Sequence, residues 1–417
     1  MPNGEQTLVV SSNTSWQHRL CRTIMLKVFA SLPQGKMVIK ERGVLVDTFG
    51  QKDSELHAEI DFQCLSVYQS LLFGGSVASG ETFSDGLWTT PNLTNVIRVF
   101  ARNLPLLDSW ESKMEWLAFP IRKISHLANK NSASGSKKNI AAHYDLGNKL
   151  YTRFLDDTMM YSSAIYPSIN STLAQAQNAK LKAVCDKLQL TSKDHVVEIG
   201  TGWGGLAVFA AKNYGCKVTT TTISEEQHQY TQNLINKEGL QDKITLLKED
   251  YRLLEGKYDK LVSIEMIEAV GKEYLPTFFK KCSSLLKDEG LMVLQAITIS
   301  DHRLESYSKS VDFIQKHIFP GGFLPSQLLI NQHLKKHTDL MIRDLHDIGL
   351  DYARTLRDWH HKLLENKEPL AEDGYDDRFM NMWRYYFSYC EGGFLERTIS
   401  TVQLVISKPA FSNSITR

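Results

Sequence analysis

Three glycines, Gly200, Gly202 and Gly205, spell the pattern G-x-G-x-x-G directly after the apolar run 195–199. Glycine in such a loop lets a ligand approach the backbone where a Cβ atom would collide with it. A fourth glycine, Gly204, is more than a plain strand-to-helix turn requires. The spacing therefore predicts a loop that binds a nucleotide, with a tight turn that binds no ligand as the alternative.

The positions of the acidic residues near these glycines indicate which nucleotide the loop binds. A dinucleotide site has a carboxylate about 20 residues further on, at the end of the second strand, which binds the ribose. Here the second strand ends in the run "TTTTIS", and the next acid is Glu225. Glu198 stands two residues before the first glycine, as in the E-x-G-x-G-x-G motif of class I S-adenosylmethionine (SAM) methyltransferases. The local residues thus leave two alternatives, methyl transfer from SAM and hydride transfer with NAD.

Helices and strands alternate along the part of the chain that carries the glycines. Helical patterns occupy 173–188, 205–214, 224–239 and 275–290, and strand patterns occupy 195–200, 217–223, 243–250, 258–265 and 290–299. This alternation predicts an α/β fold with a doubly wound, mostly parallel sheet, whose ligands bind at the carboxyl ends of the strands. The late run 400–407 is predicted to be an antiparallel edge strand.

A polar stretch divides the chain. Residues 129–138, "NKNSASGSKK", have the composition of a linker. We therefore expect an N-terminal domain over 1–128, of mixed helix and strand, and a catalytic domain over 139–417. The N-terminal domain is expected to associate with lipid or membrane. Lys and Arg total 48 against 47 Asp and Glu, so the overall charge indicates no nucleic-acid partner.

The remaining composition indicates a protein of the cytoplasm. The six cysteines lack the spacing of a zinc site, so we expect reduced thiols and no metal. The chain shows no signal-peptide pattern and no run of about 18 apolar residues. Any membrane contact is therefore expected to be peripheral.

Eight strings of the sequence, in chain order, resemble those of the cyclopropane-fatty-acyl-phospholipid synthase family. They are "ASGETFSDGLWTTPNL" (78–93), "HYDLGNKLYTRFLDDTMMYSSAIYP" (143–167), "EIGTGWGGLA" (198–207), "TTISEEQ" (221–227), "EDYR" (249–252), "EMIEAVG" (265–271), "IFPGGFLPS" (318–326) and "YYFSYCEGGF" (385–394). The resemblance implies a seven-stranded, Rossmann-like methyltransferase sheet with a smaller N-terminal α+β domain.

The resemblance also implies a reaction. Family members methylate the cis double bond of an acyl chain in a phospholipid, using SAM, and the resulting carbocation closes to a cyclopropane ring when the added methyl group loses a proton. A bound bicarbonate ion is implied as the base. Such a site stabilises the charged transition state mainly by preorganised electrostatics. We therefore expect the protein to bind peripherally to the phospholipid bilayer at the inner face of the membrane. The resemblance also allows a homodimer.

Matching positions carry the implied site residues. The residues implied to bind SAM are Tyr161, Ser162, Glu198, Gly200, Gly202, Gly204, Thr222, Gln227, Asp250 and Tyr251. Within this set, Thr222 and Gln227 replace the usual ribose acid. The residues implied to bind the bicarbonate ion are Ser163, Glu268, Gln295, Ile297 and Tyr352, and we call them the bicarbonate residues. Glu268 and Cys390, the family's late cysteine, are the implied catalytic residues.

Three positions depart from the family pattern. Ser163 stands where the family has cysteine, Ala269 where a histidine is common, and Gln295 where bacterial members often have histidine. Gln295 donates hydrogen bonds through its amide but does not titrate. Altered proton removal would give a methyl- or methylene-branched lipid in place of a ring, so this product is an alternative. Action on another lipid and a lipid-binding protein without turnover are further alternatives.

Basic residues near the linker are candidates for contact with anionic headgroups. They are Arg122, Lys123, Lys130, Lys137 and Lys138. A solvated surface is the alternative. The late aromatic residues Tyr385, Tyr386, Phe387, Tyr389 and Phe394 are interpreted as core or as the wall of an acyl slot.

Overall fold

The structure of the protein, a computed structural model, describes residues 15–109 and 147–415. The chain divides into two compact units, Met1–Glu115 and Trp116–Arg417. The expected linker 129–138 and the five basic residues near it lie outside the described residues. Among the described helices, none combines the length and apolar character that a bilayer span requires.

The N-terminal unit is α+β. Its elements are α1 (Trp16–Ala30), β1 (Lys36–Glu41), β2 (Val44–Gly50), β3 (His57–Phe62), α2 (Ser66–Ser84), β4 (Trp88–Thr89) and α3 (Leu93–Arg102). The strands form one sheet in the order β2-β1-β3-β4, in which β1 and β3 are parallel. Fully buried side chains from the helices and the sheet form the core of this unit, among them Phe29, Ile39, Ile60, Tyr68 and Val96.

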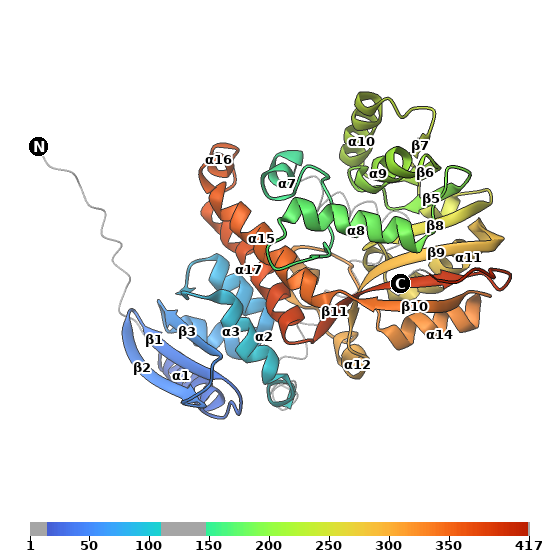
Figure 1. Cartoon of the computed structure of the whole chain (residues 1–417). Coiled ribbons are helices and arrows are strands. Elements are labelled where there is room, and N and C mark those ends of the chain that lie inside the picture. The colour runs from blue at the N-terminus through green and yellow to red at the C-terminus, as the bar shows by residue number, and fades with distance from the viewer. Residues whose placement is uncertain (1–14, 110–146, 416–417) are drawn as a thin grey trace, which may run out of the picture. The chain divides into compact units, whose positions relative to one another are not determined.

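The C-terminal unit is built on a seven-stranded sheet (Figure 1). Its strands are β5 (His195–Ile199), β6 (Lys217–Thr221), β7 (Ile244–Leu247), β8 (Tyr258–Ile264), β9 (Leu286–Ile299), β10 (Met341–Asp347) and β11 (Ile399–Ser407). They lie in the order β10-β11-β9-β8-β5-β6-β7. The strands β5 to β9 are parallel to one another, whereas β11 is antiparallel to its two neighbours, β9 and β10. This mostly parallel sheet confirms the predicted fold class.

The prediction that 400–407 is an edge strand was wrong. β11 is inserted between β9 and β10, and β10 is the edge. Almost every residue of β11 is buried, whereas β10 alternates exposed and half-buried positions. Because β10 is short and polar ("MIRDLHD"), its sequence does not show the apolar pattern of a strand.

Seven longer helices accompany this sheet among the described residues. They are α8 (Leu173–Lys187), α9 (Gly205–Tyr214), α10 (Glu225–Glu238), α11 (Leu275–Leu285), α14 (Gln327–His337), α15 (Gly349–Glu365) and α17 (Asp377–Leu395). The short helices are α7 (Asn148–Phe154), α12 (Leu304–Tyr307), α13 (Phe313–His317) and α16 (Lys367–Glu372). α11 ends before the predicted 290, because the chain joins β9 from Leu286 onward.

Local signals explain where the helices around the site begin. Thr172 and Gln175 form a capping box at the start of α8, and the Ser224 side chain accepts from the backbone N–H of Gln227 at the start of α10. α9 lies between two left-handed glycines, Gly204 before it and Gly215 after it.

Alternating strand residues bury both faces of the sheet. Val196 and Val262 pack with α8 and α9 in one core, whereas Val197 and Leu261 pack with α11 and α14 in another. This arrangement is the one that parallel sheets require, because helices cover them on both sides. In Figure 1 these helix pairs lie on opposite sides of the strands.

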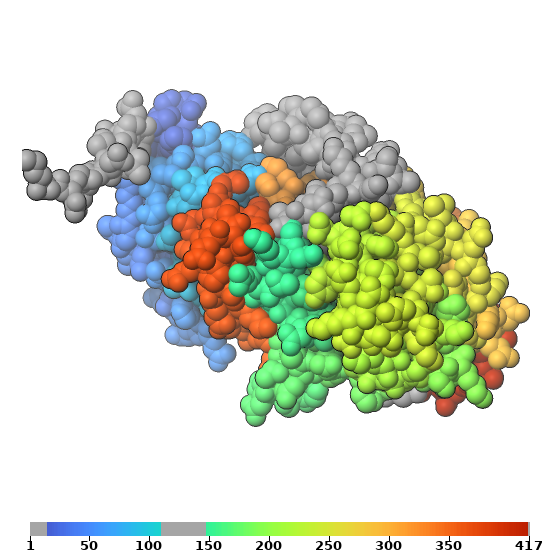
Figure 2. Space-filling view, turned by 90° about the horizontal axis from the view of Figure 1, so that it is seen from above, coloured from blue at the N-terminus to red at the C-terminus, as the bar shows by residue number. Residues whose placement is uncertain are grey.

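The C-terminal helices α15 and α17 pack along one another and also contact α7 and β11. The Lys149 ammonium of α7 forms an ion pair with the Asp373 carboxylate at the end of α16, with 2.8 Å between Nζ and Oδ1. Figure 2 shows the surface of α7 between the C-terminal helices and the half of the sheet near β6. Residues far apart in the sequence thus meet above the carboxyl ends of the strands.

Candidate active site

The glycine loop joins β5 to α9 and takes backbone conformations that favour glycine. Gly200 has φ +101° and Gly204 has φ +85°. A Cβ atom on Gly204 would lie 2.7 Å from the Thr231 methyl carbon, and one on Gly205 would lie 2.4 Å from the carbonyl oxygen of Thr158. A Cβ atom on Gly202 would meet nothing within 4 Å. Two of these glycines are therefore required by packing, while Gly202 leaves open space in which a ligand can approach the backbone.

Glu198 is buried beneath this loop. The Thr220 hydroxyl donates to its Oε2 at 2.6 Å, and Thr220 is in turn hydrogen-bonded to Thr201. Burial raises the pKa of Glu198 to about 8, although the Thr220 hydrogen bond and the charge of Lys180 oppose the shift. The carboxyl therefore holds the loop from below through hydroxyl groups.

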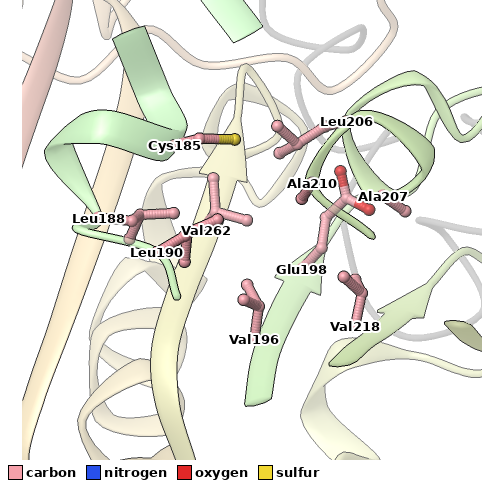
Figure 3. A pocket seen from close by; sticks show the side chains of 10 residues that line it. All are labelled: Cys185, Leu188, Leu190, Val196, Glu198, Leu206, Ala207, Ala210, Val218 and Val262. Carbon is pink, nitrogen blue, oxygen red and sulfur yellow. The ribbon is translucent and has the colours of Figure 1, made fainter. Parts of the chain in front are cut away.

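A small void lies beside Glu198 (Figure 3). Its lining is Cys185, Leu188, Leu190, Val196, Glu198, Leu206, Ala207, Ala210, Val218 and Val262. With a volume of about 10 Å³, it has room for roughly one water molecule. It is a packing void under α8 and α9, not a nucleotide site.

The residues predicted to replace the ribose acid lie at the end of β6. The Thr222 hydroxyl donates to Gln227 Oε1 at 2.8 Å, and both side chains are buried. Beyond the end of β7, the Asp250 carboxylate accepts from Arg252, with 2.8 Å between Oδ1 and Nε. Tyr251 packs edge-on against Phe278. These residues follow neighbouring strands, so they share one edge of the sheet with the glycine loop.

The segment around Tyr161 is attached to α8 by two buried polar side chains. Lys180 Nζ donates to the Ser162 hydroxyl at 2.8 Å, and Gln177 Nε2 donates to the Ser162 carbonyl oxygen at 3.0 Å. Burial lowers the pKa of Lys180 to about 8, opposed by the charges of Glu265, Asp156 and Glu198. This attachment orients the next residue, Ser163, toward the end of β8.

Glu265, the residue directly after β8, is half-buried at the centre of a hydrogen-bonded cluster. Its Oε1 accepts from the backbone N–H of Ser163 at 2.9 Å and from Gln295 Nε2 at 2.7 Å. The Tyr352 side chain lies close to this carboxylate and interacts with it electrostatically. Burial raises the pKa of Glu265, and these hydrogen bonds and the charge of Lys180 oppose the shift.

Glu268 lies near Glu265 and is likewise half-buried. Its Oε1 accepts from the backbone N–H of Ile297 at 2.5 Å, while its Oε2 is buried without a hydrogen-bond partner. Burial, with the negative charge of Glu265, raises the pKa of Glu268 to about 8. An orphaned buried oxygen of this kind indicates a position that a bound molecule completes.

Gln295 is held in one orientation by the inserted strand β11. Gln403 on β11 pairs with Gln295 in register, and its Nε2 donates to Gln295 Oε1 at 2.9 Å. Lys187 Nζ donates to Gln403 Oε1 at 2.7 Å. Because its oxygen is engaged in this way, the Gln295 amide presents its two N–H groups to Glu265 and to the Ser163 carbonyl oxygen.

Aromatic side chains surround the carboxylates. The hydroxyl groups of Tyr161 and Tyr386 are 3.0 Å apart, and the Tyr161 ring packs 5.2 Å from that of Trp359. Tyr352 stacks on Phe394, with 4.6 Å between ring centroids. These residues come from α15, α17 and the Tyr161 segment, and we call them the aromatic wall. The wall has the low polarity that an acyl chain requires.

Cys390 on α17 interacts electrostatically with Tyr352 and Tyr386, so it lies near the wall. Burial raises the pKa of its thiol, which favours the neutral thiol over the thiolate that acts as a nucleophile. Its catalytic role stays a prediction.

The structure brings together most of the residues that the sequence singled out. The bicarbonate residues converge, although the donors of Ser163, Gln295 and Tyr352 engage Glu265, which sequence reasoning missed. A carboxylate directly after an apolar strand was the available signal for Glu265. Lys180 was also missed, and its signal is a lysine within the apolar stripe of the helix 173–188.

Known proteins share both the sequence and the fold. The family model "Mycolic acid cyclopropane synthetase" matches residues 131–404. A cyclopropane-fatty-acyl-phospholipid synthase of Escherichia coli K12 is 36% identical over 84% of this chain and 88% of its own length. A tuberculostearic acid methyltransferase of Mycobacterium tuberculosis is 35% identical over 77% of this chain and 76% of its own length.

A solved structure agrees with these relatives. A mycolic acid cyclopropane synthase complexed with SAH and CTAB superposes with a TM-score of 0.61 at 27% identity, covering 65% of this chain and 98% of that one. The seven-stranded sheet, the glycine loop and these matches lead to one assignment. The chain belongs to the mycolic acid cyclopropane synthetase family and is a SAM-dependent methyltransferase related to cyclopropane-fatty-acyl-phospholipid synthases.

Proposed function

We propose that this enzyme transfers a one-carbon unit from SAM to the cis double bond of unsaturated acyl chains in membrane phospholipids, giving cyclopropane fatty acids. One observation carries the proposal: two carboxyl groups that accept hydrogen bonds from the chain lie near the glycine loop and the aromatic wall, at one edge of the sheet. An alkene offers no acidic proton before it is methylated, so the reaction needs a base only after methyl transfer. A buried acceptor in apolar surroundings suits that order of events.

The residues of the loop fit SAM. Gly202 leaves open space, while Thr222 and Gln227 present polar side chains at the end of β6 for a ribose. When bound, SAM supplies an electrophilic methyl group on a sulfonium sulfur. The aromatic wall excludes water, which would otherwise trap the carbocation as an alcohol. Ring faces of the wall also stabilise positive charge.

The residues predicted to hold bicarbonate do not fit that ion. Ser163, Gln295 and Tyr352 direct their hydrogen-bond donors at Glu265, and the Ile297 N–H is engaged by Glu268. A further anion would lie beside two buried carboxyl groups at a high electrostatic cost. We therefore assign bicarbonate no step in the proposed reaction.

A methyl- or methylene-branched product is the second candidate. The tuberculostearic acid methyltransferase matches this chain about as well as the cyclopropane synthase does. A methylene-branched product arises from the same carbocation when a hydride first shifts from the methylated carbon to the cationic carbon and a proton then leaves the added methyl group. Both products therefore lose a methyl proton to a base at the same site, and they differ in whether the hydride shift precedes that loss.

The test is an assay of the purified enzyme with SAM and vesicles of dioleoyl phosphatidylglycerol. We expect acyl chains that gain the mass of one CH₂ group, with ring protons in their NMR spectrum. Vesicles of the saturated dipalmitoyl lipid are the control and should not change. Exomethylene protons in place of ring protons would favour the branched product, and unchanged unsaturated chains would contradict both candidates.

A further inference from the structure

The carboxylate of Glu265 lies among the donors that the sequence analysis assigned to bicarbonate. Ser163 and Gln295 donate to its Oε1 at 2.9 and 2.7 Å, and the Tyr352 hydroxyl is directed at the same group from close by. These three donors come from three separate segments of the chain, and all converge on one carboxylate. A carboxylate has about four lone-pair positions, so one remains for a further proton.

The backbone at Glu265 is strained in a way that places this side chain. Its φ of +48° lies in the left-handed region, which is unfavourable for a non-glycine residue. The conformation is held because the Glu265 N–H donates to the Gln295 carbonyl oxygen at 2.8 Å. Strain of this kind clusters at functional sites.

The position of Glu265 also relates it to the methyl donor. Met266, the next residue, lies against Gly200, since a Cβ atom on that glycine would be 3.0 Å from the Met266 side chain. Glu265 and the glycine loop thus follow neighbouring parallel strands, β8 and β5, at the same edge. A base at this position is next to the place where the transferred carbon arrives.

The charges around the two carboxyl groups separate their roles. Burial raises the pKa of Glu265, and the hydrogen bonds from Ser163 and Gln295 together with the charge of Lys180 oppose this shift. Glu268 receives one N–H bond and the repulsion of Glu265, which favours its protonated form. Hydrogen bonds from the chain thus oppose the effect of burial more strongly at Glu265 than at Glu268, so Glu265 is the better placed of the two to accept a proton.

We propose that the Glu265 carboxylate is the base of this enzyme and takes the proton that a bicarbonate ion was expected to take. The inference rests on the proposed alkene methylation. In the first step a C–C bond forms between the methyl carbon and one alkene carbon, while the S–C electron pair stays on sulfur and gives SAH. In the second, a C–H bond of that methyl group breaks, its electron pair closes the ring on the cationic carbon, and the proton goes to Glu265.

The first test compares wild-type enzyme with Glu265→Gln in buffer freed of carbon dioxide, with dioleoyl phosphatidylglycerol vesicles. We expect the wild type to turn over fully without bicarbonate. General-base removal contributes about 10²- to 10⁴-fold, so Glu265→Gln should lose at least about 100-fold in kcat. Binding of SAH, measured by calorimetry, should stay near that of the wild type.

The second test uses Glu265→Gly, because glycine accepts a φ of +48° without strain. This change removes the carboxylate and leaves the three donors facing open space. We expect saturable restoration of turnover by bicarbonate or formate. Glu265→Gln is the matched control, since its side chain fills the same space and should block restoration. Glu372→Gln, an exposed position on α16, should resemble the wild type throughout.

An isotope effect separates a base from a residue that only supports the structure. With SAM carrying a CD₃ group, Glu265→Gln should show a larger isotope effect than the wild type, because methyl C–H cleavage becomes slow. Structural damage would slow methyl transfer instead, in which no methyl C–H bond breaks. A bicarbonate requirement in the wild type, near-normal turnover of Glu265→Gln, or an unchanged isotope effect would overturn the inference while the proposed function stands. A wild type inert toward unsaturated phospholipid would overturn both.

Discussion

Lys180 is a fully buried lysine on α8, and the charges that act on it are those of Glu265, Asp156 and Glu198. It connects the two parts of the site, because Glu198 lies under the glycine loop and Glu265 lies in the carboxylate cluster. Burial of so many ionisable groups costs stability, and such groups shift in pKa instead of remaining unpaired and charged. Perturbed groups gathered at one edge of a sheet are a physical sign of an active site.

At this scale, Glu268→Gln should change how stability depends on pH. The folded pKa of Glu268, about 8, lies above the ordinary value of 4.5, so the folded state binds more protons between those values. Stability of the wild type therefore falls as pH rises through this window, by at most about 1.4 kcal/mol per pH unit for one proton. The Glu268→Gln variant has no carboxyl group at this position, so its stability lacks this fall with pH.

Urea unfolding of both proteins at pH 5, 6.5 and 8 would measure this. The free energy of unfolding of the wild type, minus that of Glu268→Gln, should decrease as pH rises. The exposed Glu372→Gln variant is the control and should run parallel to the wild type. A difference between wild type and Glu268→Gln that is constant across the three pH values would contradict the burial of an ionisable Glu268.

At the scale of elements, the turn between β5 and α9 has two functions, packing of the helix and binding of SAM. Its glycines allow α9 to pack closely, and they also leave the backbone accessible to SAM. Trp203, within the same turn, donates from its indole Nε1 to Asn148 Oδ1 at 2.8 Å and so links the turn to α7. The turn is thus fixed on one side and open on the other.

Alanine substitutions at two of these glycines should affect stability and SAM binding separately. Gly205→Ala would place a Cβ atom 2.4 Å from the Thr158 carbonyl oxygen, so we expect a loss of stability of about 1–3 kcal/mol. Gly202→Ala meets no neighbour within 4 Å and has only the strain of φ +53°, so it should mainly weaken SAM binding. Thermal unfolding and SAH calorimetry of both variants would check this, and equal effects of the two substitutions on both measurements would contradict it.

At the scale of the whole molecule, the described site lies within the C-terminal unit. Its residues come from the Tyr161 segment, the ends of β5 to β9, and the helices α15 and α17. The superposition with the solved mycolic acid cyclopropane synthase covers 65% of this chain and 98% of that protein. That protein therefore consists almost entirely of the part that the two chains share. A role for the N-terminal unit in meeting the bilayer therefore remains a proposal.

We expect the whole enzyme to bind anionic vesicles peripherally, with the basic residues near the linker contributing roughly 1 kcal/mol each. Co-sedimentation with phosphatidylglycerol vesicles should weaken as salt rises, because screening reduces the attraction. Neutral phosphatidylcholine vesicles are the control. The double variant Lys137→Ser/Lys138→Ser should bind less at low salt, and an affinity that does not change with salt would contradict this electrostatic attraction.

The sequence by itself determined the fold class, the glycine loop and the family. Those features depend on local patterns, such as alternating apolar strands, capped helices and spaced glycines, whose physical meaning is contained in neighbouring residues. The prediction went wrong at β11 because a buried run does not reveal its neighbours, and the polar sequence of β10 does not reveal a strand.

Only the tertiary structure decided which group receives the donors of the active site. Ser163, Gln295 and Tyr352 are far apart in the chain, and their convergence on Glu265 depends on strand order and on the packing of α15. The insertion of β11 then fixes the Gln295 amide through Gln403. Hydrogen bonds are short-ranged and directional, so no spacing along the sequence could have shown that a carboxylate of the chain lies where an ion was expected.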